Sequence, residues 1–113
     1  MSLRPRELTA ATAAPLFAAL GDATRLALLA RLCNGHPQSI TELTRGTGLS
    51  RQGVSKHLTI LEQARVITSE RVGRESRFKV RARALQDAGR YLDRASQQWD
   101  AAIDRLKSLV EDT

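Results

Sequence analysis

The sequence predicts one mainly α-helical domain of about five helices with a small β-hairpin. Apolar residues recur at helical spacing along most of its 113 residues, which is a length suited to a single domain. Residues 66–80 instead alternate between apolar and polar side chains around Gly73, as the strands of a hairpin do. Aromatic residues make up only 4% of the chain, so the core must be built from aliphatic side chains. Such a core favours helix packing over a β-sandwich.

Capping residues delimit the first two predicted helices. The first covers residues 9–20 and ends at Gly21. The second covers residues 24–34, because Asp22 is a suitable N-cap and Gly35 follows the helix. The predicted apolar faces comprise Leu16, Phe17 and Leu20 in the first helix and Leu26, Leu28, Leu29, Leu32 and Cys33 in the second.

A short helix, a glycine turn and a longer helix follow. Ser39 and Glu42 have the spacing of a capping box, in which each side chain bonds the backbone amide of the other residue. Residues 46–48 contain two glycines and form the turn, and Ser50 is placed to cap a helix over residues 50–64. The predicted core residues of these helices are Ile40, Leu43, Val54, Leu58 and Leu61.

The chain ends in a hairpin and one long helix. The strands are predicted at residues 66–72 and 76–80, and the last helix at residues 84–111. An apolar stripe runs along this helix, and a domain of this size cannot cover so long a helix from within one chain. Pairing of two chains is therefore expected, with packing against the first helix as the alternative. The residues of the stripe are Leu92, Trp99, Ile103, Leu106 and Val110.

Positive charge is concentrated in one segment of the chain. The whole sequence carries 18 Lys or Arg and 12 Asp or Glu, a formal net charge of +6. Residues 45–83 contain ten of these basic residues and three of the acidic ones. A localised basic patch indicates a polyanionic partner, although an Arg-rich solvated surface is the alternative.

The two helices that flank the glycine turn form a helix-turn-helix unit. Since the second of them turns its apolar residues inward, its other face carries side chains suited to the major groove of DNA. Arg and Lys reach guanine, Gln reaches adenine, and Ser or Thr reaches base edges or phosphate. The predicted contacts on this helix are Ser50, Arg51, Gln52, Ser55, Lys56 and Thr59. Gly53 is an unfavourable residue within a helix. Its presence is explained either by close approach of the helix to DNA or by tolerance of glycine near a helix start.

The tip of the hairpin adds a second predicted contact with DNA. This basic wing, residues 71–77, carries Arg71, Arg74 and Arg77 beside Gly73. A basic β-tip can enter the minor groove or follow the phosphates, whereas the alternative is a charged hairpin in solvent.

On these residues the sequence resembles the ArsR-type winged helix-turn-helix regulators. The resemblance covers residues 14–80 and is carried by LGDATR, GLSRQGVSKHLTILEQARVI and GRESRFKV. The last helix, YLDRASQQWDAAIDRLKSLVE, is similar to the tail of short, metal-free members. The resemblance implies a homodimer held by the first and last helices, which places Leu16 in the interface. It also implies repression of a promoter through an imperfect palindrome in double-stranded DNA.

Metal-sensing relatives use ligands that this sequence lacks. Ser39 and Thr41 stand where some relatives carry a Cys-x-Cys pair, and the last helix has acids but no histidine. Because zinc prefers nitrogen and sulfur ligands, we expect no metal, no cofactor and no metal response. The small-molecule effector is unknown. Cys33 is the only cysteine, so no intrachain disulfide can form, and its apolar position predicts a buried structural residue.

The remaining features argue against other classes of protein. His57 and Ser55 are two residues apart and point to different faces of a helix, so they are not a catalytic pair. With no other convergent titratable groups, we expect no enzyme activity. No apolar run approaches the ~20 residues of a membrane span, and one cysteine fits the cytoplasm. The sequence thus predicts one domain over 1–113, with a DNA-binding core at 9–83 and a dimerisation helix at 84–111. A winged-helix module that binds protein or RNA is the alternative.

Overall fold

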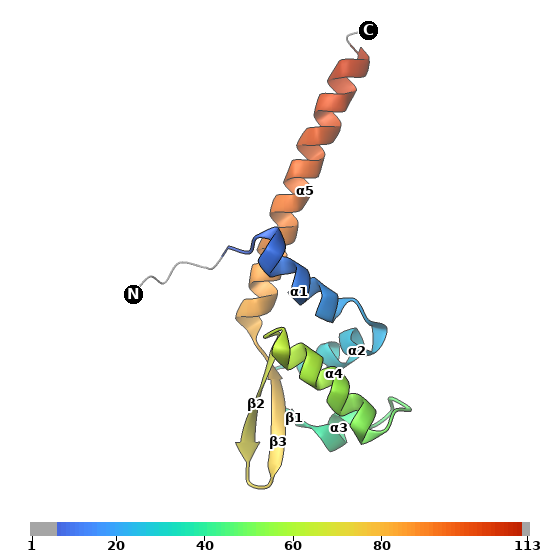
Figure 1. The fold of residues 1–113 in the computed structure, drawn as a ribbon, viewed down its shortest axis with the longest axis vertical. Helices are drawn as coiled ribbons and strands as arrows, with labels where there is room; N and C mark the ends of the chain where they lie inside the picture. Colours follow the sequence, from blue (N-terminus) through green and yellow to red (C-terminus); the bar gives the residue numbers. More distant parts are fainter. Residues whose placement is uncertain (1–6, 112–113) are drawn as a thin grey trace, which may run out of the picture.

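The computed structural model describes residues 7–111. Figure 1 shows a small body of helices with a β-hairpin at one end and a long helix leaving the other. The predicted fold, mainly α with a small β wing, is confirmed. The outermost residues of the predicted domain, 1–6 and 112–113, lie outside the described residues. The elements in order are α1 (Ala10–Leu20), α2 (Ala23–Leu32), β1 (Gln38–Ser39), α3 (Ile40–Thr44), α4 (Arg51–Gln63), β2 (Ile67–Val72), β3 (Glu75–Val80) and α5 (Ala82–Glu111).

Aliphatic residues from the helices and the sheet form one core. Leu43 of α3 and Val54, Leu58 and Leu61 of α4 are at most 1% exposed, as their spacing predicted. Ile40, also a predicted core residue, is only partly buried and packs against this cluster. Helix α4 packs against α1, α2, α3 and β2, so its orientation is fixed from several sides.

Caps set the starts of the helices where the sequence predicted them. The Asp22 carboxylate accepts a hydrogen bond from the Arg25 amide at 2.9 Å. The Ser39 hydroxyl accepts one from the Glu42 amide at 3.2 Å, and the Ser39 amide donates back to Oε1 of Glu42 at 3.2 Å. These bonds satisfy amides that have no partner within their own helix.

The capping box should make the stability of the fold sensitive to acid. Hydrogen bonds from the Ser39 amide and hydroxyl lower the pKa of Glu42 below its ordinary value. A carboxyl whose pKa is lower in the folded state contributes stability above its unfolded pKa and loses it as the pH falls through the folded pKa. Glu42→Gln keeps the capping oxygen but cannot titrate. Urea unfolding should favour the wild type at about pH 7, and the difference should shrink as the pH falls below the ordinary pKa of a glutamate carboxyl. A difference that did not change with pH would contradict this explanation.

The sheet has one strand more than the sequence predicted. Strand β1 pairs antiparallel with β3, so the strand order is β1-β3-β2, and Ser39 lies opposite Arg77. A two-residue strand is too short to show alternation in sequence. The hairpin itself turns at Gly73 as predicted, and its register places Ile67 opposite Val80 and Val72 opposite Glu75.

Two predicted apolar positions of the second helix lie on the surface instead. Cys33 is exposed, so its prediction as a buried residue was wrong. Helix α2 ends at Leu32, and Cys33 serves as its C-cap. Leu26 is 50% exposed, because the buried face is centred on Leu28, Leu29 and Leu32. The exposed pair, Leu26 and Cys33, fits helical spacing as well as the buried residues do. Only packing against α4 decides which of these residues are buried.

Helix α4 ends in a left-handed residue. Arg65 has φ 60° and is the one non-glycine residue in the described part of the chain with positive φ. The Val66 amide donates to the Leu61 carbonyl at 3.0 Å, and the Arg65 amide donates to Glu62 at 2.9 Å. These two bonds form a Schellman motif, in which glycine is the preferred residue at the position of Arg65.

Arg65→Gly should therefore stabilise the protein. A left-handed conformation costs an L-residue ~1–2 kcal/mol, and the greater freedom of glycine in the unfolded chain cancels part of that gain. We expect a rise of about 1 kcal/mol in the free energy of unfolding, measured by urea denaturation. Arg65→Ala is the matched control, since it removes the same side chain but keeps Cβ. Equal stabilities of the Gly and Ala variants would show that the backbone conformation is not the cause.

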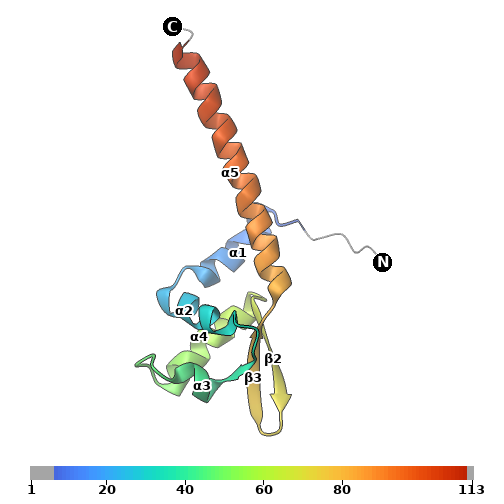
Figure 2. The ribbon, with the colours of Figure 1, turned by 180° about the vertical axis from the view of Figure 1, so that it is seen from behind.

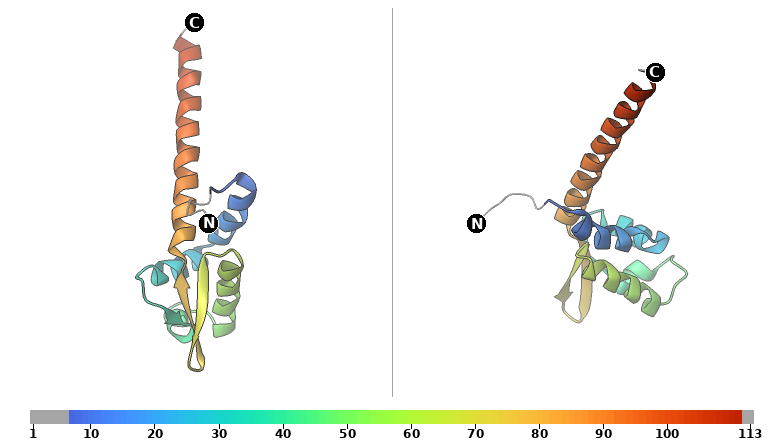
Figure 3. Two further views of the ribbon diagram at one scale, coloured as in Figure 1. Left: turned by 90° about the vertical axis from the view of Figure 1, so that its left-hand side faces the viewer. Right: turned by 45° about the horizontal axis from the view of Figure 1, so that its top comes forward.

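The long helix projects from the body in every view (Figures 2 and 3). Helix α1 packs across the first half of α5, where Phe17 and Tyr91 have ring centroids 5.8 Å apart. Arg94 donates to the Leu8 carbonyl at 3.0 Å and lies over the Tyr91 ring. Within residues 7–111 no single helix is long and apolar enough to cross a membrane, and α1 with α2 meets that test only as a pair bent by 91°.

Candidate nucleic-acid interface

Helix α4 buries one side and exposes a polar one. Gln52, Lys56 and Thr59 are exposed on the side that faces away from the core, and Ser55 is partly exposed there. Arg51 is exposed in the first turn of the helix. We call these five residues the exposed polar face of α4. Four of them, all but Thr59, lie in its N-terminal half, which is the part of such a helix that meets base edges in the major groove.

The turn before α4 is held by hydrogen bonds that place the start of the helix. Gly46 and Gly48 have φ of 76° and 72°, which glycine adopts without strain. The Thr47 hydroxyl donates to the Thr44 carbonyl at 2.7 Å and accepts from the Leu49 amide at 3.1 Å. Arg31 of α2 donates to the Leu43 carbonyl at 2.8 Å and so fixes α3 to α2.

Two hydroxyl groups of the predicted contact set already have partners. Ser50 Oγ accepts from the Gly53 amide at 3.0 Å, and Thr59 donates to the Ser55 carbonyl at 3.0 Å. Ser50 keeps its own proton free to donate to a phosphate. A Cβ at Gly53 would lie 3.3 Å from Ser50 Oγ. Arg25 and Glu42 occupy the same position after their own caps, so this contact does not by itself require glycine.

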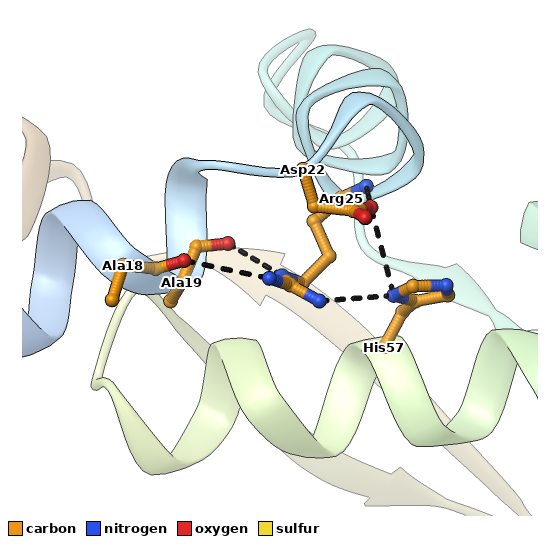
Figure 4. Close-up of polar contacts among 5 residues, drawn as sticks. All are labelled: Ala18, Ala19, Asp22, Arg25 and His57. Carbon is orange, nitrogen blue, oxygen red and sulfur yellow. Dashed lines mark hydrogen bonds and ion pairs between the residues drawn. The ribbon is translucent and has the colours of Figure 1, made fainter.

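An arginine from α2 ties α4 to α1 (Figure 4). The Nε of Arg25 donates to the Ala19 carbonyl at 2.5 Å, and its NH2 donates to Ala18 at 3.4 Å. Its NH1 lies 3.3 Å from Nδ1 of His57 on α4. The guanidinium can only donate, so His57 is the acceptor wherever this contact is a hydrogen bond. We call this set of contacts the Arg25 bridge.

Asp22 completes the Arg25 bridge. Its Oδ2 lies 3.8 Å from Nδ1 of His57, and the same oxygen accepts from the Arg25 amide. This backbone hydrogen bond, together with the charge of Arg25, lowers the pKa of Asp22. His57 is partly buried. The bridge thus joins the end of α1, the start of α2 and the middle of α4.

The basic wing presents two arginines at its tip and a third below it. Arg71 and Arg74 are exposed beside Gly73, which has φ 66°. Arg77 is only partly exposed, and its NH2 lies 3.5 Å from Oε2 of Glu75. The charge of Arg77 also contributes to the lowered pKa of Glu42. The positive charge of Arg77 is therefore partly balanced, in contrast to the simple basic tip expected from sequence.

Comparisons with known proteins match this arrangement. The helix-turn-helix domain family matches residues 20–70. The HTH-type transcriptional regulator Rv2034 of Mycobacterium tuberculosis is 32% identical over 93 residues, which cover 82% of this chain and 83% of that protein. An ArsR-like transcriptional regulator from Rhodococcus sp. RHA1 has a similar structure, with a TM-score of 0.76 and 34% identity. The match covers 88% of this chain and 92% of the other.

This chain belongs to the ArsR-type winged helix-turn-helix regulators. As an ArsR-type regulator it is a DNA-binding transcriptional regulator. A homodimeric winged helix-turn-helix domain from Mycobacterium bovis, Mb0332, shares the fold with a TM-score of 0.61 and 19% identity. That match covers 84% of each chain.

The apolar stripe of this ArsR-type regulator lies on the projecting part of α5. Trp99 is 71% exposed and Leu106 is 62% exposed. Leu109, which the predicted stripe omitted, is also exposed. Leu16 differs from the stripe, because it is buried in the chain's own core at 7% exposure. The exposed apolar residues of α5 are Leu92, Trp99, Ile103, Leu106, Leu109 and Val110.

One of the two positions at which some ArsR-type relatives carry metal ligands has a structural role here. Ser39 caps α3, and the neighbouring Thr41 is exposed. Within residues 7–111, no three or more His, Cys, Asp or Glu side chains lie close enough together to hold a metal ion.

Proposed function

We propose that this regulator is a homodimeric repressor that binds an imperfect palindrome. Helix α4 lies in the major groove, and the basic wing follows the phosphates or the adjacent minor groove. The observation that carries the proposal is the exposed polar face of α4, held on its opposite side by the core and by the Arg25 bridge. A helix so fixed can place side chains against base edges with a defined register.

The proposed contacts divide into two groups. Arg51, Gln52 and Ser55 read bases, and Lys56 reaches either guanine or a phosphate. Ser50 and Thr59 supply hydroxyl groups near the DNA backbone. Arg71 and Arg74 of the basic wing bind phosphates, and Arg77 adds a weaker contribution because Glu75 pairs with it. The protein works in the cytoplasm and carries out no catalysis.

The dimer rests on the unpartnered apolar stripe of α5. The homodimeric state of the M. bovis domain supports the same assembly here. A two-fold protein places two copies of α4 about one helical turn of DNA apart, so it matches a palindrome.

The decisive experiment is a gel shift of the full chain with the DNA upstream of its own gene. A scrambled duplex and an RNA of the same sequence serve as controls. We expect a retarded band for the upstream DNA alone, and a footprint of two half-sites about 10 base pairs apart. Transcription from that promoter should rise when the gene is deleted. Equal binding of the scrambled duplex, or tighter binding of the RNA, would refute the proposal.

Metals should leave DNA binding unchanged. Ser39 and Thr41 cannot act as thiolate ligands, and α5 carries no histidine. Titration of the DNA complex with zinc, cadmium or arsenite under reducing conditions should give the same affinity as the metal-free protein. Stoichiometric release of DNA by any of the three would contradict this expectation.

A further inference from the structure

A cavity of about 480 Å³ lies where α1, the end of α4 and the start of α5 meet. This volume falls in the range of small-molecule sites. Its lining has an apolar part, formed by Leu8, Pro15, Leu16, Ala64 and Ala84. An occupant therefore needs an apolar body a few carbon atoms long.

The charged part of the lining is dominated by arginine. Arg65, Arg81 and Arg83 all face the cavity. Within residues 7–111, the Arg65 guanidinium has no hydrogen bond or ion pair. Arg81 donates to the Arg65 carbonyl at 3.2 Å, and it has no carboxylate partner in the same range. Guanidinium groups grouped in this way favour a carboxylate or phosphate.

The acids at the cavity do not pair with Arg65 or Arg81. Asp87 is paired with Arg90, which lies outside the lining. Glu7 is exposed to solvent at the edge of the described residues. We therefore propose that the cavity binds a small organic anion with an apolar body, and that this anion is the effector of the regulator.

The position of the cavity gives the anion a route to the DNA-binding surface. Arg65 follows the C-cap of α4, and Arg81 joins β3 to α5, so one anion bound to both links the recognition helix to the dimerisation helix. Occupancy also neutralises charge in the basic segment 45–83. We expect the bound anion to weaken DNA binding, and DNA to weaken anion binding by the same factor. This regulatory consequence rests on the proposed function, whereas binding of the anion does not.

The cavity lies apart from most of the apolar stripe on which the proposed dimer rests. It uses Ala84 and Asp87, in the first turns of α5, whereas most of the exposed apolar stripe lies between Trp99 and Val110. Dimerisation and anion binding can therefore be tested independently on the full chain.

The test is calorimetry of the full chain with octanoate, octylamine and 1-octanol, three probes with one apolar tail and different head charges. We expect octanoate to bind with one site per chain, and the other two to bind at least about tenfold more weakly. Equal binding of the three probes would overturn the proposal.

Arg65→Gly provides the variant that cannot be dismissed as unfolded, because glycine relieves the left-handed residue. It should weaken octanoate about tenfold, while Arg65→Lys retains most of the affinity. Arg74→Ala, in the basic wing, should lose DNA affinity and bind octanoate as the wild type does. Octanoate binding that survives Arg65→Gly and disappears in Leu106→Asp would place the ligand on the apolar stripe of α5 and overturn the proposal. Failure to bind the palindrome without octanoate would instead refute the proposed function.

Discussion

Leu106→Asp should convert the dimer into a 12.4 kDa monomer and remove tight binding to the palindrome. Leu106 is 62% exposed in one chain and belongs to the stripe that a partner would cover. An unpaired carboxylate buried in an apolar interface costs several kcal/mol. Loss of the second half-site then removes the gain from linked binding, so the affinity for the palindrome should fall about 100-fold or more.

Sedimentation at micromolar concentration measures the first effect, and a DNA titration measures the second. Ser108→Asp is the matched control, because it adds the same charge two residues further along α5 and off the apolar stripe. The control should remain dimeric. A wild-type protein that sediments only as the 12.4 kDa species would rule out the dimer altogether.

Gln52→Ala and Arg74→Ala should weaken DNA binding in different ways. Gln52 belongs to the exposed polar face of α4, so its loss should cost ~1–3 kcal/mol at the cognate site and relax the preference at one base pair. Arg74 lies at the tip of the hairpin, where no rigid frame fixes a base contact. Its loss should weaken cognate and scrambled DNA alike and reduce the salt slope by about 0.9.

Titrations of both variants against cognate and scrambled duplexes over a salt series separate these effects. Arg105→Ala is the control for the loss of one positive charge, since Arg105 is exposed on α5 far from α4 in the chain. Lys56 has a long side chain and can reach either guanine or phosphate. The same salt series, applied to a variant that lacks Lys56, decides between these two contacts. If Arg74→Ala erased the sequence preference and Gln52→Ala had no effect, the basic wing, and not α4, would make the sequence-specific contacts.

Features set by local sequence were predictable, and features set by distant contacts were not. Asp22, Ser39 and Ser50 cap their helices as their residue types indicate, since a cap depends on amides within three residues. The buried side of α4 followed from its spacing in the same way. These local signals were sufficient to locate the helix-turn-helix unit and the side of α4 that faces solvent.

The departures all involve residues far apart in sequence. Arg25 and His57 are 32 residues apart, and nothing local to either indicates that they meet. Strand β1 exists only because β3 lies beside it. The exposure of Cys33 depends on which side of α2 packs against α4. Each of these features is decided by tertiary packing, which a periodic pattern in one segment does not contain.

The Arg25 bridge also bears on how such a protein acquires new targets. The residues that anchor α4 are His57 and the buried Val54, Leu58 and Leu61, and none of them belongs to the exposed polar face. Substitutions on that face therefore leave the anchoring contacts intact, and solvent-exposed changes of this kind usually alter stability by only about 0.5 kcal/mol. Target preference can thus diverge between gene copies while the scaffold stays constant. Grafting the exposed polar face of a relative onto this chain should transfer the relative's preferred sequence together with it.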